Sequence, residues 1–242
     1  MGQIVSLSLY RFEGRAARAW AFAMMGLARW PMRRVPGIGF WKLCGSGSGV
    51  GFLPRPNLGV YAILATWPDE RSARAALGDA PIFRRYRAHA AESWTLLLRP
   101  VSARGRWSGR VPFTPQPRGG GGPIAALTRG TIRPRALRGF WGRVPAISER
   151  IAADREVLFK IGIGEVPWLH QVTVSVWPDA AAMARFARTG AHAEAIAAVR
   201  REGWFSEDLY ARFEVAGEIG TWGGVPPLLP SPASIPQPRE IA

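Results

Sequence analysis

Three histidines, His89, His170 and His192, are the side chains of this sequence best suited to bind a transition metal. A metal-binding imidazole has to be neutral, and the helix dipole favours the neutral form in a first turn and the charged form in a last turn. His192 follows Gly190 and lies in a first turn if a helix restarts there, whereas His89 lies near the end of a predicted helix. His170 begins a predicted strand, on the face of three valines. We rank His192 first, His170 second and His89 last as a ligand. For each, the alternative is a hydrogen-bonded or surface histidine without a metal.

The only two lysines, Lys42 and Lys160, each lie among apolar residues in a predicted strand. Their ammonium groups could anchor an acidic group of a cofactor, so both are candidate cofactor-binding residues. The alternative, which we favour, is a structural role in which each lysine extends its charge to solvent or pairs with a carboxylate. Cys44 is the single cysteine, which excludes an intramolecular disulfide and an all-cysteine metal site.

Other sequence patterns exclude common site types. The glycine run GSGSGVG at 45–51 fits neither a dinucleotide fingerprint nor a phosphate loop, because a strand rather than a helix is predicted after it. We expect a mobile loop there, shaped as a lid over a pocket. Motifs of serine hydrolases and zinc peptidases are absent from the sequence. No residue is therefore assigned as a catalytic acid, base or nucleophile.

The sequence repeats itself, and this repeat predicts the elements that position these residues. FWKLCGSG at 40–47 and ATWPD at 65–69 correspond to LFKIGIG at 158–164 and SVWPD at 175–179, and each half ends on a similar signal, GRWSG at 105–109 and GTWGG at 220–224. The match pairs Lys42 with Lys160 and Trp67 with Trp177. We predict that most of Trp41, Trp67, Trp168, Trp177 and Trp204 belong to the core, with the alternative that a few of them line an apolar pocket.

Each half reads as βαββαβ, so we expect an α+β fold made of two ferredoxin-like units in tandem. The first half predicts helices 16–27 and 70–91 with strands 4–10, 40–43, 60–67 and 94–98. The second predicts helices 140–153 and 180–201 with strands 124–132, 157–163, 169–177 and 209–215. The expected domains are repeat 1–111, a flexible Pro/Gly linker 112–122, repeat 123–224 and a disordered proline-rich tail 225–242. The two sheets are expected to pack face to face, as in a dimeric α+β barrel built here by one chain.

Charge and hydropathy favour a soluble or peripheral membrane protein over one that spans the bilayer. The net charge is +15, which attracts the protein to anionic surfaces. The most apolar predicted helix, 19–28, is about half the length that crosses a bilayer, and the N-terminus does not resemble a signal peptide. We expect a soluble or peripheral protein in a reducing compartment.

Several of these segments resemble the spheroidene monooxygenase family of purple phototrophic bacteria. The likeness covers about residues 3–224. Its most specific stretches are FWKLCGSG at 40–47, RGRWSG at 104–109, FKIGIGEVPW at 159–168 and EGWFSEDLYARF at 202–213.

The resemblance implies a haem-dependent monooxygenase that uses O2 and electrons from reduced ferredoxin. Its substrates would be the acyclic carotenoids spheroidene and hydroxyspheroidene, oxidised at C-2 to ketones by two successive hydroxylations. The resemblance supplies no ligand motif for the haem iron, so the histidine ranking above stands by itself. The implied location is the cytoplasmic face of the intracytoplasmic photosynthetic membrane, with anionic lipid as a partner.

The competing interpretation is a binding protein without turnover. A ferredoxin-like repeat with a basic surface could carry haem, another tetrapyrrole or a lipid, or bind RNA. Against RNA, the basic residues are scattered and lack the aromatic pattern of RNA-recognition domains, so we expect no nucleic-acid partner. The sequence leaves the oligomeric state open.

Overall fold

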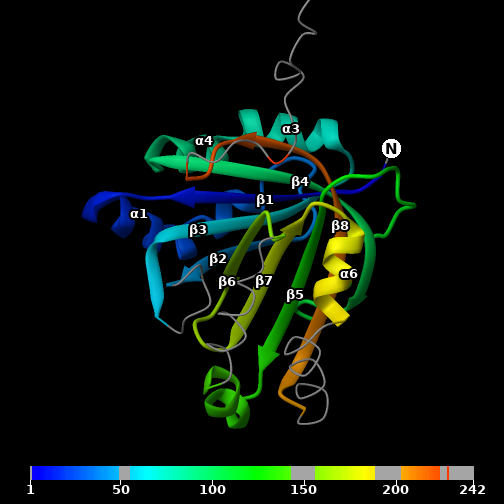
Figure 1. The fold of residues 1–242 in the computed structure, drawn as a ribbon. Coiled ribbons are helices and arrows are strands. Elements are labelled where there is room, and N and C mark those ends of the chain that lie inside the picture. Colours follow the sequence, from blue (N-terminus) through cyan, green and yellow to red (C-terminus); the bar gives the residue numbers. More distant parts are fainter. Residues whose placement is uncertain (1, 49–54, 143–155, 189–202, 224–227, 229–242) are drawn as a thin grey trace, which may run out of the picture.

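The chain forms an eight-stranded antiparallel barrel with helices on its outer face (Figure 1). The computed structural model describes residues 2–48, 55–142, 156–188, 203–223 and 228. In chain order the strands are β1 (Ile4–Arg11), β2 (Trp41–Gly47), β3 (Pro56–Trp67), β4 (Glu92–Gly105), β5 (Ile124–Ile132), β6 (Phe159–Gly164), β7 (His170–Trp177) and β8 (Phe205–Gly220). The helices are α1 (Gly14–Leu27), α2 (Arg29–Met32), α3 (Glu70–Asp79), α4 (Pro81–His89), the 3-10 turn η1 (Pro134–Ala136) and α6 (Ala180–Arg188). Most predicted helices and strands are therefore present, and several strands are longer than predicted.

The barrel closes in the order β1-β3-β2-β6-β7-β5-β8-β4. The first half contributes β4-β1-β3-β2 and the second β8-β5-β7-β6, so the two halves have the same strand order. They meet through their edges, β2 with β6 and β4 with β8, rather than face to face as expected. Edge pairing satisfies the backbone groups that two separate sheets would leave open. The α+β barrel is confirmed, whereas its origin by tandem duplication stays a prediction.

Alternation along the strands produces two large core clusters, and two smaller ones lie around Phe140 and around Ala182 and Met183 in the second half. One large cluster fills the barrel and includes Leu7 and Leu9 of β1 with Val172, Val174 and Val176 of β7. The other large cluster lies between the outer face of the first-half sheet and helices α1, α3 and α4. Strand β1 is buried on both sides, and its buried serines Ser6 and Ser8 are hydrogen-bonded, to the Trp67 indole and the Thr95 hydroxyl.

The two repeat tryptophans occupy matching places, but the two lysines do not. Trp67 pairs with Ile4, and Trp177 pairs with Ile124, the corresponding residue of β5. Lys42 lies opposite Leu64, three residues before Trp67, whereas Lys160 lies opposite Ser175, two residues before Trp177. The predicted match of the lysines is thus wrong by one residue.

This one-residue difference in register places Lys42 and Lys160 on opposite faces of the sheet. Lys42 shares the face of Cys44, which packs inside the barrel. Lys160 alternates with the interior residues Ile161 and Ile163 and therefore faces outward.

Three expected boundaries differ for local reasons. The single helix 70–91 is two helices, because Pro81 fixes Ala80 in an extended conformation and starts α4. The start of the glycine run is strand rather than loop, since Gly45 and Ser46 pair with Gly164 and Ile163 of β6. The helix expected at 140–153 is described only over 137–142.

The linker after the first half is anchored along the barrel. Phe113 is buried and packs edge-on against Phe213 at 5.1 Å between ring centroids. The backbone N–H groups of Gly119 and Gly120 donate hydrogen bonds to the carboxylate of Glu214. The flexibility expected for the linker 112–122 stays a prediction. The proline-rich tail lies outside the described residues apart from position 228.

Candidate functional site

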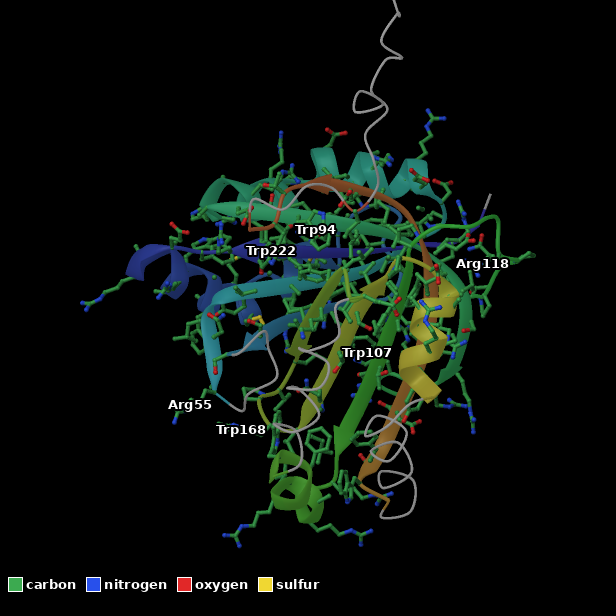
Figure 2. All side chains as sticks on the ribbon, in the orientation of Figure 1. Arg55, Trp94, Trp107, Arg118, Trp168 and Trp222 are labelled. Carbon is green, nitrogen blue, oxygen red and sulfur yellow. The ribbon has the colours of Figure 1, made fainter. Side chains whose placement is uncertain are left out.

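A network of charged side chains lies at one end of the barrel interior, around the indole of Trp107. Lys42 of β2 and Glu165, directly after β6, form an ion pair with 2.5 Å between Nζ and Oε1. The Trp107 indole Nε1–H donates to Glu165 Oε2 at 2.8 Å, and Lys42 donates to the Ser108 hydroxyl at 2.6 Å. Trp107 is fully buried and belongs to the core that fills the barrel (Figure 2).

His170 is the histidine that joins this network. Its Nδ1 lies 3.3 Å from Glu165 Oε2, close enough for an ion pair but without the alignment of a good hydrogen bond. The side chain continues the inward face of Val172, Val174 and Val176, as the alternation predicted. A carboxylate beside Nδ1 favours a proton on that atom and leaves the lone pair on Nε2, the tautomer that metal-ligating histidines usually adopt.

The carboxylate of Glu165 stays ionised far below neutral pH. Burial alone would raise its pKa, but the contacts with His170 and Lys42, the charge of Lys42 and the Trp107 indole outweigh burial and lower the pKa to about 2. The negative charge that faces His170 is therefore permanent under physiological conditions.

A second ion pair lies across the same indole. Arg129 of β5 is 1% exposed, and its guanidinium lies 2.5 Å from the carboxylate of Glu207 on β8. Burial would raise the pKa of Glu207, but the N–H groups of Gly109 and Ser108 and the charge of Arg129 lower it. The cationic groups of Lys42 and Arg129 lie 5.9 Å and 5.7 Å from the Trp107 ring centroid, within cation–π distance.

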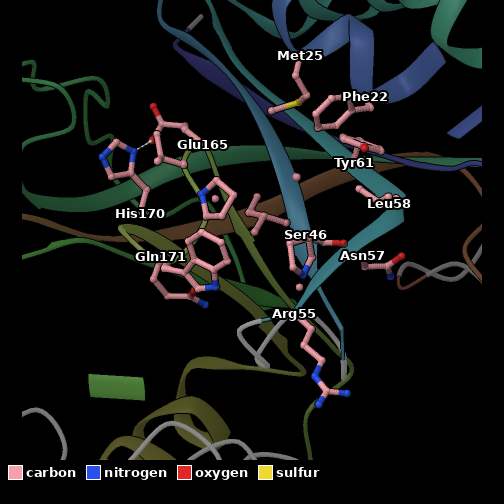
Figure 3. Close-up of a pocket in the computed structure, with 18 of the residues that line it drawn as sticks. Phe22, Met25, Ser46, Arg55, Asn57, Leu58, Tyr61, Glu165, His170 and Gln171 are labelled. Atoms are coloured by element: carbon pink, nitrogen blue, oxygen red, sulfur yellow. Dashed lines mark ion pairs between the residues drawn. The ribbon is translucent and has the colours of Figure 1, made fainter. Parts of the chain in front are cut away.

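A pocket of about 210 Å³ opens beside His170 and Glu165. Figure 3 shows these two residues on one side of it, with Phe22, Met25, Tyr61 and Leu58 on the other. Most of the remaining wall comes from the ends of β2, β3 and β6 and the turn before β7. Its surface is mainly apolar, with Arg55 at the rim. Such a space suits the end of a long apolar molecule.

The other residues singled out from the sequence lie elsewhere. His89 is exposed, stacks on Trp20 with 3.9 Å between ring centroids, and has Nδ1 2.9 Å from the Arg85 carbonyl oxygen. His192 lies outside the described residues. Lys160 faces outward from β6 and does not line this pocket.

The tryptophans divide into core and surface. Trp67, Trp177 and Trp204 are buried, as expected. Trp168 is 54% exposed and lines the pocket, which is the alternative that the sequence left open for a few of these residues.

No sequence pattern singles out Glu165, Trp107, Arg129 or Glu207 as a site residue. Glu165 and Glu207 do fall within the stretches 159–168 and 202–213, and Trp107 within 104–109. Their convergence was not visible, because each comes from a different part of the chain. Within the described ranges, no group of three or more His, Cys, Asp or Glu side chains forms a metal cluster, and no helix is long and apolar enough to cross a membrane.

The fold and the site together define an α+β barrel protein with an apolar pocket beside a carboxylate-supported histidine. Two solved structures of aldoxime dehydratase share this fold. One superposes with a TM-score of 0.57 at 12% identity, over 88% of this chain and 81% of that one. The other, a complex with butyraldoxime, gives a TM-score of 0.59 at 13% identity, over 88% and 79%. Identity at this level shows the fold alone.

Curated relatives define the family. The chain is 48% identical to a spheroidene monooxygenase of Cereibacter sphaeroides over 99% of this chain and 77% of the relative. It is 48% identical to that of Rhodobacter capsulatus over 93% and 95%. The spheroidene monooxygenase of Rubrivivax gelatinosus is 36% identical over 86% and 81%. No family model matches the sequence. The protein belongs to the spheroidene monooxygenase family.

Proposed function

We propose that the protein is a haem-dependent monooxygenase that introduces a keto group at C-2 of acyclic carotenoids, converting spheroidene to spheroidenone and hydroxyspheroidene to hydroxyspheroidenone. The observation that carries this proposal is the apolar pocket beside His170, whose Nδ1 faces the ionised carboxylate of Glu165. Family membership makes the carotenoid the first substrate to test. Electrons come from reduced ferredoxin in this proposal.

The pocket has the character that the end of a carotenoid requires. Phe22, Leu58 and Tyr61 offer apolar and aromatic surface, and a volume of about 210 Å³ admits a chain end rather than a whole polyene. Because C-2 lies near the end of the acyclic molecule, an end-on pose would present that carbon at the bottom of the pocket. There it would meet the side of the pocket that holds His170 and Glu165.

The residues fit haem in their donor chemistry. His170 would offer Nε2 to the iron, and Glu165 would hold the Nδ1 proton and fix the plane of the ring, as carboxylates do behind metal-bound histidines. Lys42 and Trp107 in turn hold Glu165. Lys42 is therefore occupied by a protein carboxylate, which supports its structural role over contact with a haem propionate.

Haem binding also requires a pocket of sufficient volume. The pocket is smaller than the roughly 300–1,000 Å³ of most small-molecule sites, so haem binding has to move part of its wall. Phe22 and Leu58, at 65% and 51% exposure, border solvent and can swing outward.

Bound haem would supply the activation of O2 that insertion into an unactivated C–H bond requires and that amino-acid side chains lack. Each hydroxylation uses one O2, two electrons and two protons and releases one water. A second hydroxylation of the same carbon gives a geminal diol, which loses water to leave the ketone. The protein's own task is to hold C-2 in place between the two rounds and to exclude bulk water.

The decisive experiment compares His170→Ala with His192→Ala in purified, haem-supplemented protein. We expect the wild type to show a Soret band and, with O2 and reduced ferredoxin, to convert spheroidene to spheroidenone. If His170 is the ligand, His170→Ala loses both the band and the product while His192→Ala keeps both. The reverse result would assign the iron to His192, the residue ranked first from sequence.

Two further outcomes bear on the proposal itself. Normal haem binding in both variants would remove both histidines from the coordination sphere. A wild-type Soret band without any ketocarotenoid under reducing, aerobic conditions would favour a haem carrier over an oxygenase.

The proposed location is the cytoplasmic face of the intracytoplasmic photosynthetic membrane, with peripheral association. A net charge of +15 supports attraction to anionic lipid, and the proposed substrate dissolves in the bilayer.

A further inference from the structure

Four exposed apolar side chains surround the opening of the pocket. Phe22 is 65% exposed, Trp168 54%, Leu58 51% and Val166 40%, and all four line the same pocket. They come from α1, β3 and the turn between β6 and β7. Single exposed apolar residues are ordinary, but a group gathered around one opening marks a surface that contacts something apolar.

The backbone of Trp168, which holds this side chain at the surface, has a strained conformation. Its φ is 63°, in the left-handed region that a bulky residue rarely enters. The Trp168 carbonyl accepts a hydrogen bond from the Trp141 indole at 3.1 Å, which helps to hold the turn. Strained conformations of this kind persist at sites that serve function.

Arginines flank the same opening. Arg18, Phe22 and Met25 follow one another at spacings of four and three residues, so they share one face of α1. Arg29 begins α2 four residues after Met25, and its Nε–H donates a hydrogen bond to the Met25 carbonyl oxygen. Arg55 lies at the rim from the side of β3 (Figure 3). All three arginines are exposed. Among the described residues that line the pocket, Glu165 is the one acidic side chain, and Lys42 pairs with it.

We propose that this rim, made of Phe22, Leu58, Val166 and Trp168 with Arg18, Arg29 and Arg55, docks on an anionic lipid bilayer. The apolar side chains enter the interfacial region while the arginines contact lipid phosphates. The pocket then opens directly into the membrane, and an apolar substrate passes into it without crossing water. The identity of that substrate rests on the proposed function, whereas the docking itself does not.

The first test measures which arginines contribute to the binding of anionic vesicles. Wild-type protein and two double variants are sedimented with vesicles of phosphatidylglycerol and phosphatidylcholine in equal parts, and with pure phosphatidylcholine. Arg18→Gln/Arg29→Gln removes two rim charges. Arg104→Gln/Arg212→Gln removes two exposed charges from β4 and β8, and β8 lies across the barrel from β2.

We expect the rim variant to bind anionic vesicles more than tenfold more weakly, at about fivefold per arginine, and the matched variant to bind nearly as the wild type does. Salt should release the wild type from these vesicles. Equal losses in the two variants would show that net charge rather than this rim drives binding, and would overturn the proposal. So would wild-type protein that ignores anionic vesicles but is captured by an acidic protein such as ferredoxin.

The second test asks whether the rim enters the lipid. Leu58→Cys and Val111→Cys are each labelled with a polarity-sensitive fluorophore. Val111 is 65% exposed and does not line the pocket, and Cys44 is fully buried with its thiol pKa raised by that burial, so it stays unlabelled. Anionic vesicles should shift the emission of the label at 58 to the blue and leave the label at 111 unchanged. Similar emission at both positions in bound protein would contradict docking through this face.

A turnover assay separates this proposal from the proposed function. Arg18→Gln/Arg29→Gln, which alters no pocket-lining residue, should oxidise detergent-dispersed spheroidene as the wild type does and lose most activity on spheroidene held in vesicles. If the wild type oxidises spheroidene in neither form while both vesicle tests succeed, the proposed function fails and the docking surface stands. If the rim variant retains full activity on vesicle-held spheroidene, the proposed route of entry is wrong.

Discussion

The ammonium of Lys42 lies 2.5 Å from the carboxylate of Glu165, and this ion pair joins the two halves of the barrel. Strands β2 and β6 share only two ladder pairs, Gly45 with Gly164 and Ser46 with Ile163, whereas β4 and β8 pair over much of their length. The ion pair therefore reinforces the shorter seam, the same seam that borders the pocket.

Loss of this ion pair should destabilise the fold. Both side chains are largely buried, at 17% and 13% exposure, so Lys42→Met should cost about 3 kcal/mol because it leaves Glu165 without its cation. Urea unfolding of Lys42→Met, Glu165→Gln and the double variant measures the coupling. The double variant should cost less than the two single variants added together, and additive effects would show that the pair contributes nothing of its own.

Stability should fall in acid through Glu165. Its pKa is lowered in the folded protein from the ordinary value of 4.5 to about 2, so its contribution is present above about pH 4.5 and is lost as the pH falls toward about 2. Urea midpoints should therefore separate wild type from Glu165→Gln at pH 7 and bring them together toward pH 3. A gap that stays constant across this range would assign the loss in the variant to packing rather than to ionisation.

Haem affinity should depend on Glu165 if His170 is the iron ligand. Glu165→Gln removes the charge that faces Nδ1, and loss of such a partner typically weakens metal binding about 10–100-fold. Titration of the Soret band measures the effect. Glu207→Gln is the matched control, because it also removes a carboxylate near Trp107, and the contacts of Glu207 are with Arg129, Ser108 and Gly109. Equal weakening by both variants would point to general damage at this end of the barrel.

Gly164 should not tolerate a side chain. A Cβ at this position would lie 2.1 Å from the backbone oxygen of His170, at the hairpin that carries both Glu165 and His170. Gly164→Ala should destabilise by several kcal/mol, about 2–4, because the backbone itself must shift. Gly26→Ala on α1 meets no atom within 4 Å and should instead stabilise by about 0.5–1 kcal/mol through helix propensity. Thermal unfolding of the two variants tests both the expected loss and the expected gain of stability. An unchanged melting temperature for Gly164→Ala would contradict the close approach of the His170 backbone oxygen to position 164.

Local structure was largely predictable because neighbouring residues determine it. The alternation of 170–177 predicts a strand with one buried face, and Val172, Val174 and Val176 are buried in the barrel. Helices do begin at 70 and 180 as predicted, where the carboxylates of Asp69 and Asp179 accept hydrogen bonds from the N–H groups of Ser72 and Ala182. The order of strands and helices and the family resemblance likewise follow from residues close together in the sequence.

The site was decided by the tertiary structure. Glu165 has no neighbour in sequence that reveals its role, because Lys42, Trp107 and the barrel seam reach it from the other half of the chain. A register difference of one residue separates Lys42, which faces inward, from Lys160, which faces outward, and this shift is invisible in matching motifs. The sequence by itself determined which segments become strands and helices and which family the chain resembles. Only closure of the barrel, through edge-to-edge hydrogen bonding between its halves, decided which charged side chains meet inside it.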